Sequence, residues 1–299
     1  MSGPVGGAAF ERLGAERWHF QHGPIDLIID VEGDAEASQR GIAACWDEFQ
    51  GVLPGLVREL PTLRCAVDDR TTPRGPVARR MLRACRAFAD ERFITSMAAV
   101  AGAVSDHLIT QFDQPGIQRA CINNGGDIAL FLAPGANFRV GICSHPERAG
   151  ATPSGRVPLS GAFTIDRYAP VRGIATSGWR GRSFSLGVAD SVTVLAADAA
   201  TADAAATLIG NAVNCLHSGI VRAPADQLKD DTDLGSRLVT VDVPRLPTSA
   251  VDAAVVAGRV EAELWRDRGL IFGAAIALQG RMEVVMPVSN PALVHRAAA

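Results

Sequence analysis

The chain has 299 residues, 47% of them hydrophobic, and a formal net charge of -3. This hydrophobic content is enough for a packed core and excludes a disordered chain. The near-neutral, interspersed charge argues against nucleic acid as a partner, because that backbone is bound through concentrated positive charge. No apolar run approaches the roughly 20 residues that cross a bilayer. Residues 1–12 lack the features of a secretion signal, so we expect a cytoplasmic protein that does not engage a membrane.

Hydrophobic periodicity predicts both helices and strands along the chain. Helices are expected at 36–60, 76–93, 97–112, 201–218 and 249–268, and strands at 25–29, 118–122, 128–132, 138–143, 173–176, 191–195, 238–243, 270–278 and 282–287. We expect Pro54 to kink or divide the first helix, and Thr95, Ser96 and Ser249 to act as N-caps. Residues 145–161 read as an exposed loop. No clear linker separates domains, so the sequence predicts one α+β domain over residues 1–299.

The first candidate site motif is the run Asn123, Asn124, Gly125, Gly126 and Asp127 between two strand-like segments. Paired glycines permit positive φ and let backbone N–H groups approach a phosphate or a ring carbonyl. The same pattern is also a strong signal for a plain β-hairpin turn. Both interpretations stay open at this point.

The second motif holds Thr176, Ser177 and Gly178, followed by Trp179 and two arginines at positions 180 and 182. Hydroxyls and guanidinium groups suit phosphate oxygens, and an indole face can stack on a planar ring. A capped surface turn with solvated arginines is the alternative.

The third motif places Asp203 and Thr207 four residues apart in a predicted helix. This spacing puts both side chains on one helical face, where two oxygens can meet one hard cation. Alternatively, Thr201 or Asp203 serves only as a helix N-cap or a first-turn acid.

Taken in order, these motifs resemble the ApbE superfamily of FAD:protein FMN transferases, whose members bind flavin nucleotides. The resemblance rests on an N-x-G-G-D-I type run at 122–128, A-T-S-G at 175–178, the strand at 191–195 and a T-A-D-A-x-A-T motif at 201–207. The small-residue segment 98–106 lies where the family has A-K-G-x-x-x-D. The resemblance implies a single ApbE-like α+β domain of mixed or antiparallel sheets packed with helices.

It also implies a magnesium ion at Asp203 and Thr207 that bridges the diphosphate of FAD, with the nucleotide held by the first two motifs. Magnesium suits this arrangement because it takes few protein oxygens and fills its shell with phosphate and water. The family's H-x-x-D-P-x-T-G segment is absent, and Ala101 and Gly102 stand nearest to its usual lysine. The chain therefore resembles a shortened, functionally uncharacterised bacterial and archaeal branch of the superfamily.

No catalytic residue is assigned by the motifs. Cys143 and His145 lie close in sequence and are candidates for nucleophile and base, although neighbouring side chains of an extended chain point apart. The acidic run 229–235 lacks the full pattern of a calcium loop, so we read it as a solvated loop.

Three functions follow as hypotheses. The leading one is a magnesium-assisted flavin-nucleotide protein, either an FMN transferase or an FAD hydrolase. The others are an enzyme that acts on a different small anion or heterocycle, and a non-catalytic protein that delivers flavin to a partner flavoprotein. The expected ligand is a small-molecule nucleotide, and the small-residue helix and apolar C-terminal strands leave a homodimer open.

Overall fold

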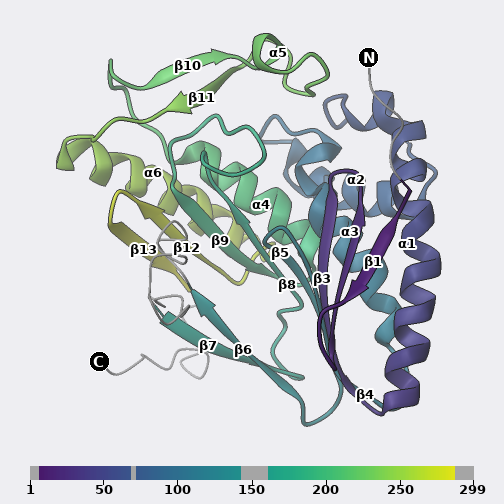
Figure 1. Ribbon diagram of the computed structural model, residues 1–299. Coiled ribbons are helices and arrows are strands. Elements are labelled where there is room, and N and C mark those ends of the chain that lie inside the picture. The colour runs from purple at the N-terminus through teal and green to yellow at the C-terminus, as the bar shows by residue number, and fades with distance from the viewer. Residues whose placement is uncertain (1–6, 69–71, 143–160, 287–299) are drawn as a thin grey trace.

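The computed structural model describes residues 7–68, 72–142 and 161–286. Within these residues, nine strands form one sheet in the order β1-β2-β3-β4-β5-β8-β9-β12-β13, and every neighbouring pair is antiparallel (Figure 1). The strands are β1 (Ala9–Arg12), β2 (Arg17–His22), β3 (Ile25–Gly33), β4 (Ile117–Asn124), β5 (Asp127–Leu132), β8 (Gly173–Ser177), β9 (Ser191–Ala196), β12 (Gly273–Leu278) and β13 (Arg281–Val285). Two small antiparallel ribbons join β6 (Asn137–Ile142) to β7 (Gly161–Asp166) and β10 (Val221–Pro224) to β11 (Leu238–Asp242).

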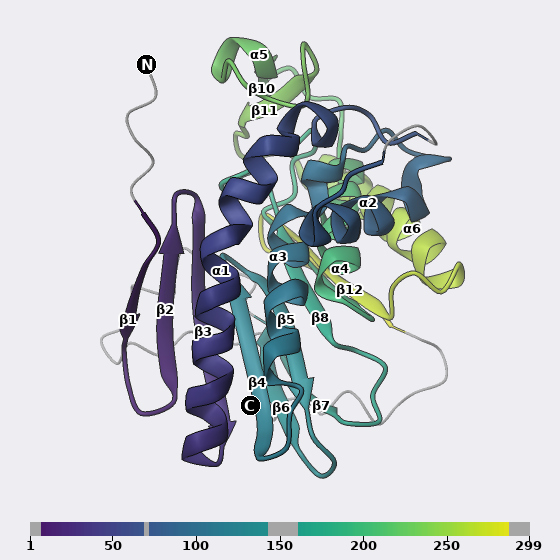
Figure 2. The same cartoon turned by 90° about the vertical axis from the view of Figure 1, so that its right-hand side faces the viewer.

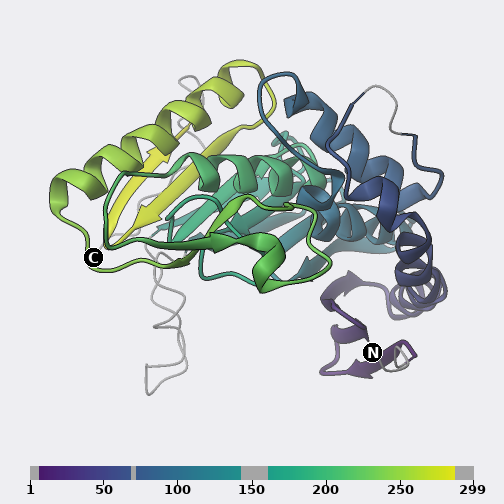
Figure 3. The same ribbon diagram turned by 90° about the horizontal axis from the view of Figure 1, so that it is seen from above.

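The long helices cover one face of the sheet (Figures 2 and 3). They are α1 (Ala35–Leu63), α2 (Pro76–Ala89), α3 (Val100–Leu108), α4 (Ala199–Ala212) and α6 (Thr248–Asp267), with short α5 (Ala225–Leu228) and the 3-10 turns η1 (Ser96–Ala99) and η2 (Ile109–Phe112). Strand β3 shows why this face is buried: Ile25, Leu27, Ile29 and Val31 alternate with less buried residues and point into the main core. The prediction of an α+β protein with antiparallel sheet and packed helices is confirmed.

The opposite face of the sheet is covered in part by the β6–β7 ribbon. Leu130, Leu132 and Ile174 of the sheet form a second cluster with Ile165 of β7, and Phe138 of β6 packs against it. The sheet is therefore sandwiched near its centre, next to the strands that carry the glycine turn.

Of the two expected effects of Pro54, a kink or a division of the first helix, the division does not occur. Helix α1 continues through Pro54 and Pro61 as one 29-residue helix. A proline inside a helix costs about 3 kcal/mol, but buried side chains lie on both sides of Pro54, Phe49 and Val52 before it and Leu56 and Leu63 after it. Each such side chain contributes about 1.5–3 kcal/mol on burial, so packing on the sheet outweighs the lost hydrogen bond.

Helix α4 begins and ends earlier than predicted. The Asp198 side chain accepts a hydrogen bond from the backbone N–H of Thr201 at 2.7 Å, so Asp198 is the N-cap. The helix ends at Ala212, because Val213 takes an extended backbone conformation, and the Val213 carbonyl accepts a hydrogen bond from the Val188 N–H. The chain then leaves the helix axis well before residue 218.

The predicted cap at Ser249 is wrong, because helix α6 starts at Thr248, directly after Pro247, and Ser249 already lies inside it. Thr95 takes the predicted N-cap position, at the start of η1, but its side chain makes no cap bond and its hydroxyl donates to Asp233. The predicted helix 97–112 is split into η1, α3 and η2.

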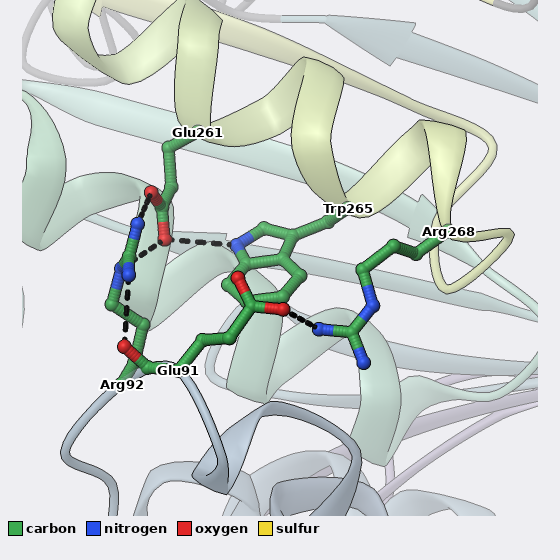
Figure 4. Close-up of polar contacts among 5 residues, drawn as sticks. All are labelled: Glu91, Arg92, Glu261, Trp265 and Arg268. Atoms are coloured by element: carbon green, nitrogen blue, oxygen red, sulfur yellow. Dashed lines mark hydrogen bonds and ion pairs between the residues drawn. The ribbon is translucent and has the colours of Figure 1, made fainter.

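A polar clamp fixes the segment after α2 to helix α6 (Figure 4). The guanidinium of Arg92 donates to both carboxylate oxygens of Glu261, at 2.9 and 2.7 Å, and the indole N–H of Trp265 donates to the same carboxylate at 3.1 Å. Glu261 is only 5% exposed. Arg268 also pairs with Glu91. Because Phe93 follows Arg92 directly, the clamp sets the position of a residue that lines the cavity described below.

Among the described residues, no helix is both long enough and apolar enough to pass through a bilayer.

Candidate functional site

A cavity of about 270 Å³ lies between helices η1, α3 and α4, the start of β5, and two loops at 182–186 and 229–234. Its apolar wall includes Phe93, Met97, Phe184 and Leu186. Its charged residues are Arg64, Asp127, Arg182, Asp203, Lys229, Asp231 and Asp233. The cavity therefore offers carboxylates, cationic groups and aromatic surface to one ligand.

The glycine motif delivers Asp127 to this cavity. Strands β4 and β5 pair as a hairpin whose two turn residues, Gly125 and Gly126, have φ of +66° and +115°. The amide oxygen of Asn123 accepts a hydrogen bond from the N–H of Gly126 at 2.8 Å and closes the turn. The hairpin interpretation is confirmed, and it is compatible with a site because Asp127, the next residue, lines the cavity.

Asp127 is held by three elements. Its carboxylate accepts a hydrogen bond from the Thr176 N–H at 3.3 Å, and its backbone carbonyl accepts from the Ser105 hydroxyl at 2.9 Å. The side chain is buried. Strands β5 and β8 and helix α3 thus fix the carboxylate before any ligand arrives.

Asp203 reaches the cavity from α4 and caps α3. Its carboxylate accepts a hydrogen bond from the backbone N–H of Gly102 at 3.0 Å, in the first turn of α3, where amides lack helical partners. A Cβ atom on Gly102 would lie 2.2 Å from the carbonyl oxygen of Ala199. Only glycine permits this close approach of α3 to α4, which brings Asp203 within reach of the amide.

A second acid completes a reciprocal arrangement. Asp106, in the last turns of α3, accepts hydrogen bonds from the N–H groups of Ala199 and Ala200, at 2.9 and 2.8 Å, at the start of α4. Each helix therefore carries a carboxylate that caps the N-terminus of the other.

Burial governs the electrostatics of these acids. It raises the pKa of Asp203 well above its ordinary value, and the negative charge of Asp127 raises it further. Burial also raises the pKa of Asp127, against the lowering effects of the Thr176 hydrogen bond and the Arg182 charge. The pKa of Asp106 is raised to about 7 by burial and by the charge of Asp198. A cation between Asp127 and Asp203 would relieve the cost of ionising both.

Other predicted binding residues support the turn and contact protein groups. The Asn124 amide donates to the carbonyl of Ala101 at 3.2 Å. The Thr176 hydroxyl shares a hydrogen bond with the Thr193 hydroxyl at 2.9 Å. Ser177 ends β8, and Gly178 packs so tightly that a Cβ atom there would lie 2.3 Å from the Asp190 carbonyl oxygen. Of the two predicted metal ligands, both Asp203 and Thr207 line the cavity.

The two arginines that follow Gly178, Arg180 and Arg182, have different surroundings. Arg182 lines the cavity and lies on the glycine turn, since a Cβ atom on Gly125 would be 2.2 Å from its Nη2 atom. The indole of Trp179 instead directs its N–H toward Asp190, and Arg180 stacks over the indole ring at 4.9 Å. Cys143 and His145, the candidate nucleophile and base, lie outside the described residues.

Residues 229–235, predicted to form a solvated loop, are exposed at Lys229 and Asp231, but residues 229–234 also form one wall of the cavity, which the sequence did not indicate. Asp231 pairs with Arg64 at 2.8 Å and Asp233 accepts from Thr95, so the loop is fastened beside the cavity. Both contacts join residues more than a hundred positions apart, which no local pattern reveals.

The donor set fits magnesium. Within the described ranges, no three His, Cys, Asp or Glu side chains cluster as a ready-made metal centre. Magnesium commonly uses one or two carboxylates and completes its shell with water and substrate phosphate. Asp127 and Asp203, with the Thr207 hydroxyl one helical turn further along α4, offer that kind of incomplete shell.

Solved structures similar to this chain include two ApbE proteins. The flavinyl transferase ApbE of Pseudomonas stutzeri, in its apo form, aligns with 94% of this chain and 93% of its own at 12% identity and a TM-score of 0.44. The ApbE protein of Thermotoga maritima aligns with 92% of this chain and 96% of its own at the same identity and TM-score.

Comparison of sequences finds closer relatives. A UPF0280 protein of Methanospirillum hungatei is 35% identical over 188 residues, which cover 62% of this chain and 69% of that protein. A UPF0280 protein of Methanocorpusculum labreanum is 37% identical over 197 residues, 66% of this chain and 77% of that protein. The family model described as AbpE bacteria matches residues 9–284. This chain therefore belongs to the AbpE bacteria family, and the matched range contains all three candidate site motifs.

Proposed function

We propose that this protein binds a flavin nucleotide, FAD or FMN, through a magnesium-dependent diphosphate site, and that it acts on FAD as an FMN transferase or a hydrolase. The observation that carries the proposal is the convergence of Asp127 and Asp203 on one cavity, each with a pKa raised by burial. Membership of an ApbE-like family supports flavin as the ligand.

Asp127, Asp203 and Thr207 would hold the ion, and Arg182 would contact the phosphate oxygens beside the glycine turn. When bound, magnesium supplies positive charge that stabilises the diphosphate as its P–O–P link breaks. The two carboxylates are held by backbone N–H groups of Thr176 and Gly102, so they need little reorganisation to receive it.

The size of the cavity limits what it holds. A volume of about 270 Å³ lies just below the ~300–1,000 Å³ of pockets for drug-sized ligands. We therefore assign to it the diphosphate and one adjoining group, with the rest of the dinucleotide outside. Phe93 and Phe184 on the wall offer aromatic surface to a planar ring.

The two activities share one product. Hydrolysis adds water across the diphosphate of FAD and gives FMN and AMP. Transfer joins the FMN phosphoryl group to an acceptor hydroxyl, for which a flavoprotein target is the expected source, and also releases AMP. AMP release therefore reports either reaction, and acceptor dependence separates them.

The test measures bound flavin and released AMP after purified protein is incubated with FAD and magnesium. Asp203→Asn is the test variant, and Glu36→Gln, which neutralises an exposed acid on α1, is the charge-matched control. We expect native protein and the control to bind FAD, and Asp203→Asn to lose most of the magnesium-dependent binding. Binding without AMP release would favour a flavin-delivery protein over an enzyme. Absence of flavin binding by native protein contradicts the proposal and leaves a different small anion or heterocycle as the ligand.

A further inference from the structure

The loop 229–234 belongs to a segment of the chain that lies outside the main sheet. Strands β10 and β11 and helix α5 form a separate ribbon above α4 and α6 (Figure 1). The loop returns to the cavity and is fastened there by the Arg64–Asp231 ion pair and the Thr95–Asp233 hydrogen bond. Lys229 begins this cavity wall.

Lys229 is exposed, and its ammonium group makes no hydrogen bond or ion pair with the residues that the structure describes. The pKa of Asp231 is lowered chiefly by its hydrogen bond and charge contact with Arg64, with a smaller contribution from Lys229. Arg64 and Lys229 both act on the Asp231 carboxylate. Because Arg64 already forms the ion pair with Asp231, the Lys229 ammonium group stays available to a ligand.

The charged residues that line the cavity come from two parts of the chain. Asp127 and Asp203 lie on β5 and α4, whereas Arg64, Lys229, Asp231 and Asp233 lie on or beside the loop, where Arg64 pairs with Asp231 and Asp233 accepts from Thr95. A diphosphate bound through a metal at Asp127 and Asp203 still carries negative charge, and an ammonium group is a strong point-charge partner for phosphate.

Resting on the proposed function, we propose that Lys229 is a ligand-binding residue that contacts a phosphate group of the nucleotide from the loop side of the cavity. It is a specificity residue for phosphorylated ligands and takes no part in holding the metal. The loop 229–234 is then a functional wall, positioned by Arg64 and Thr95.

A single lysine allows a direct chemical test. An N-hydroxysuccinimide ester of acetic acid acylates accessible amines, so mass spectrometry of the peptide containing Lys229 gives its labelling rate without interference from other lysines. The rate is measured for the native chain alone, with FAD and magnesium, with inorganic pyrophosphate and magnesium, and with riboflavin, which has no phosphate. We expect FAD and pyrophosphate to slow labelling at least fivefold and riboflavin to leave it unchanged.

Affinity measurements show whether Lys229 contacts the ligand directly or is only shielded from the labelling reagent when the ligand binds elsewhere. Lys229→Met should weaken FAD binding about tenfold, as expected for loss of one charged hydrogen bond, and Lys229→Arg should restore most of it. Arg245→Met removes one positive charge from an exposed position outside this cavity and should leave the affinity unchanged.

Different results contradict the Lys229–phosphate contact and the flavin function. FAD binding with equal affinity in Lys229→Met, and without protection of Lys229, overturns the inference and leaves the flavin function standing. Protection by pyrophosphate in a protein that does not bind FAD supports the phosphate contact and removes the flavin proposal. If neither ligand protects Lys229, the inference is wrong.

Discussion

Asp106 and Asp203 cap each other's helices: Asp106 of α3 accepts hydrogen bonds from the first amides of α4, and Asp203 of α4 accepts one from the first turn of α3. Capping the start of a helix with a carboxylate is favourable because the unpaired N–H groups carry partial positive charge. Here the same hydrogen bonds hold one candidate metal ligand in place. The stability of the α3–α4 pair and the geometry of the site are therefore linked.

The contact between these helices predicts a large effect of Gly102→Ala. The added Cβ atom would lie 2.2 Å from the Ala199 carbonyl oxygen, so the helices must separate. Overpacking of this kind costs about 1–3 kcal/mol of unfolding free energy. The control is Gly51→Ala, at a helical position with no atom within 4 Å, which should stabilise by about 0.5–1 kcal/mol. Urea denaturation measures the unfolding free energy of both variants. Equal unfolding free energies would contradict the close approach of α3 to α4.

The raised pKa of Asp203 predicts a pH dependence of stability in metal-free protein. The unfolded chain loses this proton near pH ~3.9, whereas the folded chain keeps it to higher pH because desolvation of the carboxyl group and the nearby charge of Asp127 raise its pKa. The contribution to stability is therefore full below that pH and is lost as pH rises through the folded pKa. Asp203→Asn cannot ionise, so its unfolding free energy relative to native protein should rise by about 1–3 kcal/mol from pH 5 to pH 8. A constant difference between the two proteins would show that the pKa is not raised.

The glycine turn predicts a specific loss in Gly125→Ala. Alanine at φ +66° is strained, and its Cβ atom would meet the guanidinium of Arg182 at 2.2 Å. Gly135→Ala has a similar φ of +84° but open space around the Cβ atom, so it isolates the backbone effect. Both variants should lose about 1 kcal/mol of stability. Only Gly125→Ala should weaken the binding of FAD, measured by calorimetry, because only it displaces Arg182.

The clamp on α6 predicts that Arg92→Met destabilises the fold strongly. Its partner Glu261 is 5% exposed, so removal of Arg92 leaves a buried carboxylate without its ion-pair partner. Loss of one partner of a buried pair costs about 3–5 kcal/mol, and the half-exposure of Arg92 places our expectation at the lower end. Arg281→Met breaks exposed pairs with Asp252 and Glu283 and should cost at most about 1 kcal/mol. Similar thermal shifts in both variants would contradict the structural importance of the clamp.

Much of the fold was predictable because it follows from local patterns. The alternation of apolar residues along β3 predicted a buried strand. The run of small residues around Gly102 predicted a closely packed helix. The end of α4 was not predicted, and the contact made there, between the Val213 carbonyl and the Val188 N–H, joins residues that no local pattern relates. The uninterrupted α1 was missed for a similar reason: propensity weighs against Pro54, and only tertiary burial overrides it.

The residues of the candidate site also fall into those that local patterns predict and those that they do not. Asp203 and Thr207 could be found from their helical spacing, and Asp127 from the adjacent glycines. Arg64 and Asp231 could not, because their pairing across 167 positions leaves no periodic signal. Sequence motifs thus identified the residues placed by one turn or one helix, and only the fold reveals those brought together by long-range contacts.

The central claim is that Asp127 and Asp203 together make nucleotide binding depend on magnesium. The most direct test is the Kd of FAD at pH 8 with magnesium and with a chelator, measured by calorimetry for native protein, Asp203→Asn and Glu36→Gln. We predict that magnesium tightens binding at least tenfold in native protein and in Glu36→Gln and has little effect in Asp203→Asn. The same affinity with and without magnesium in native protein would contradict the account.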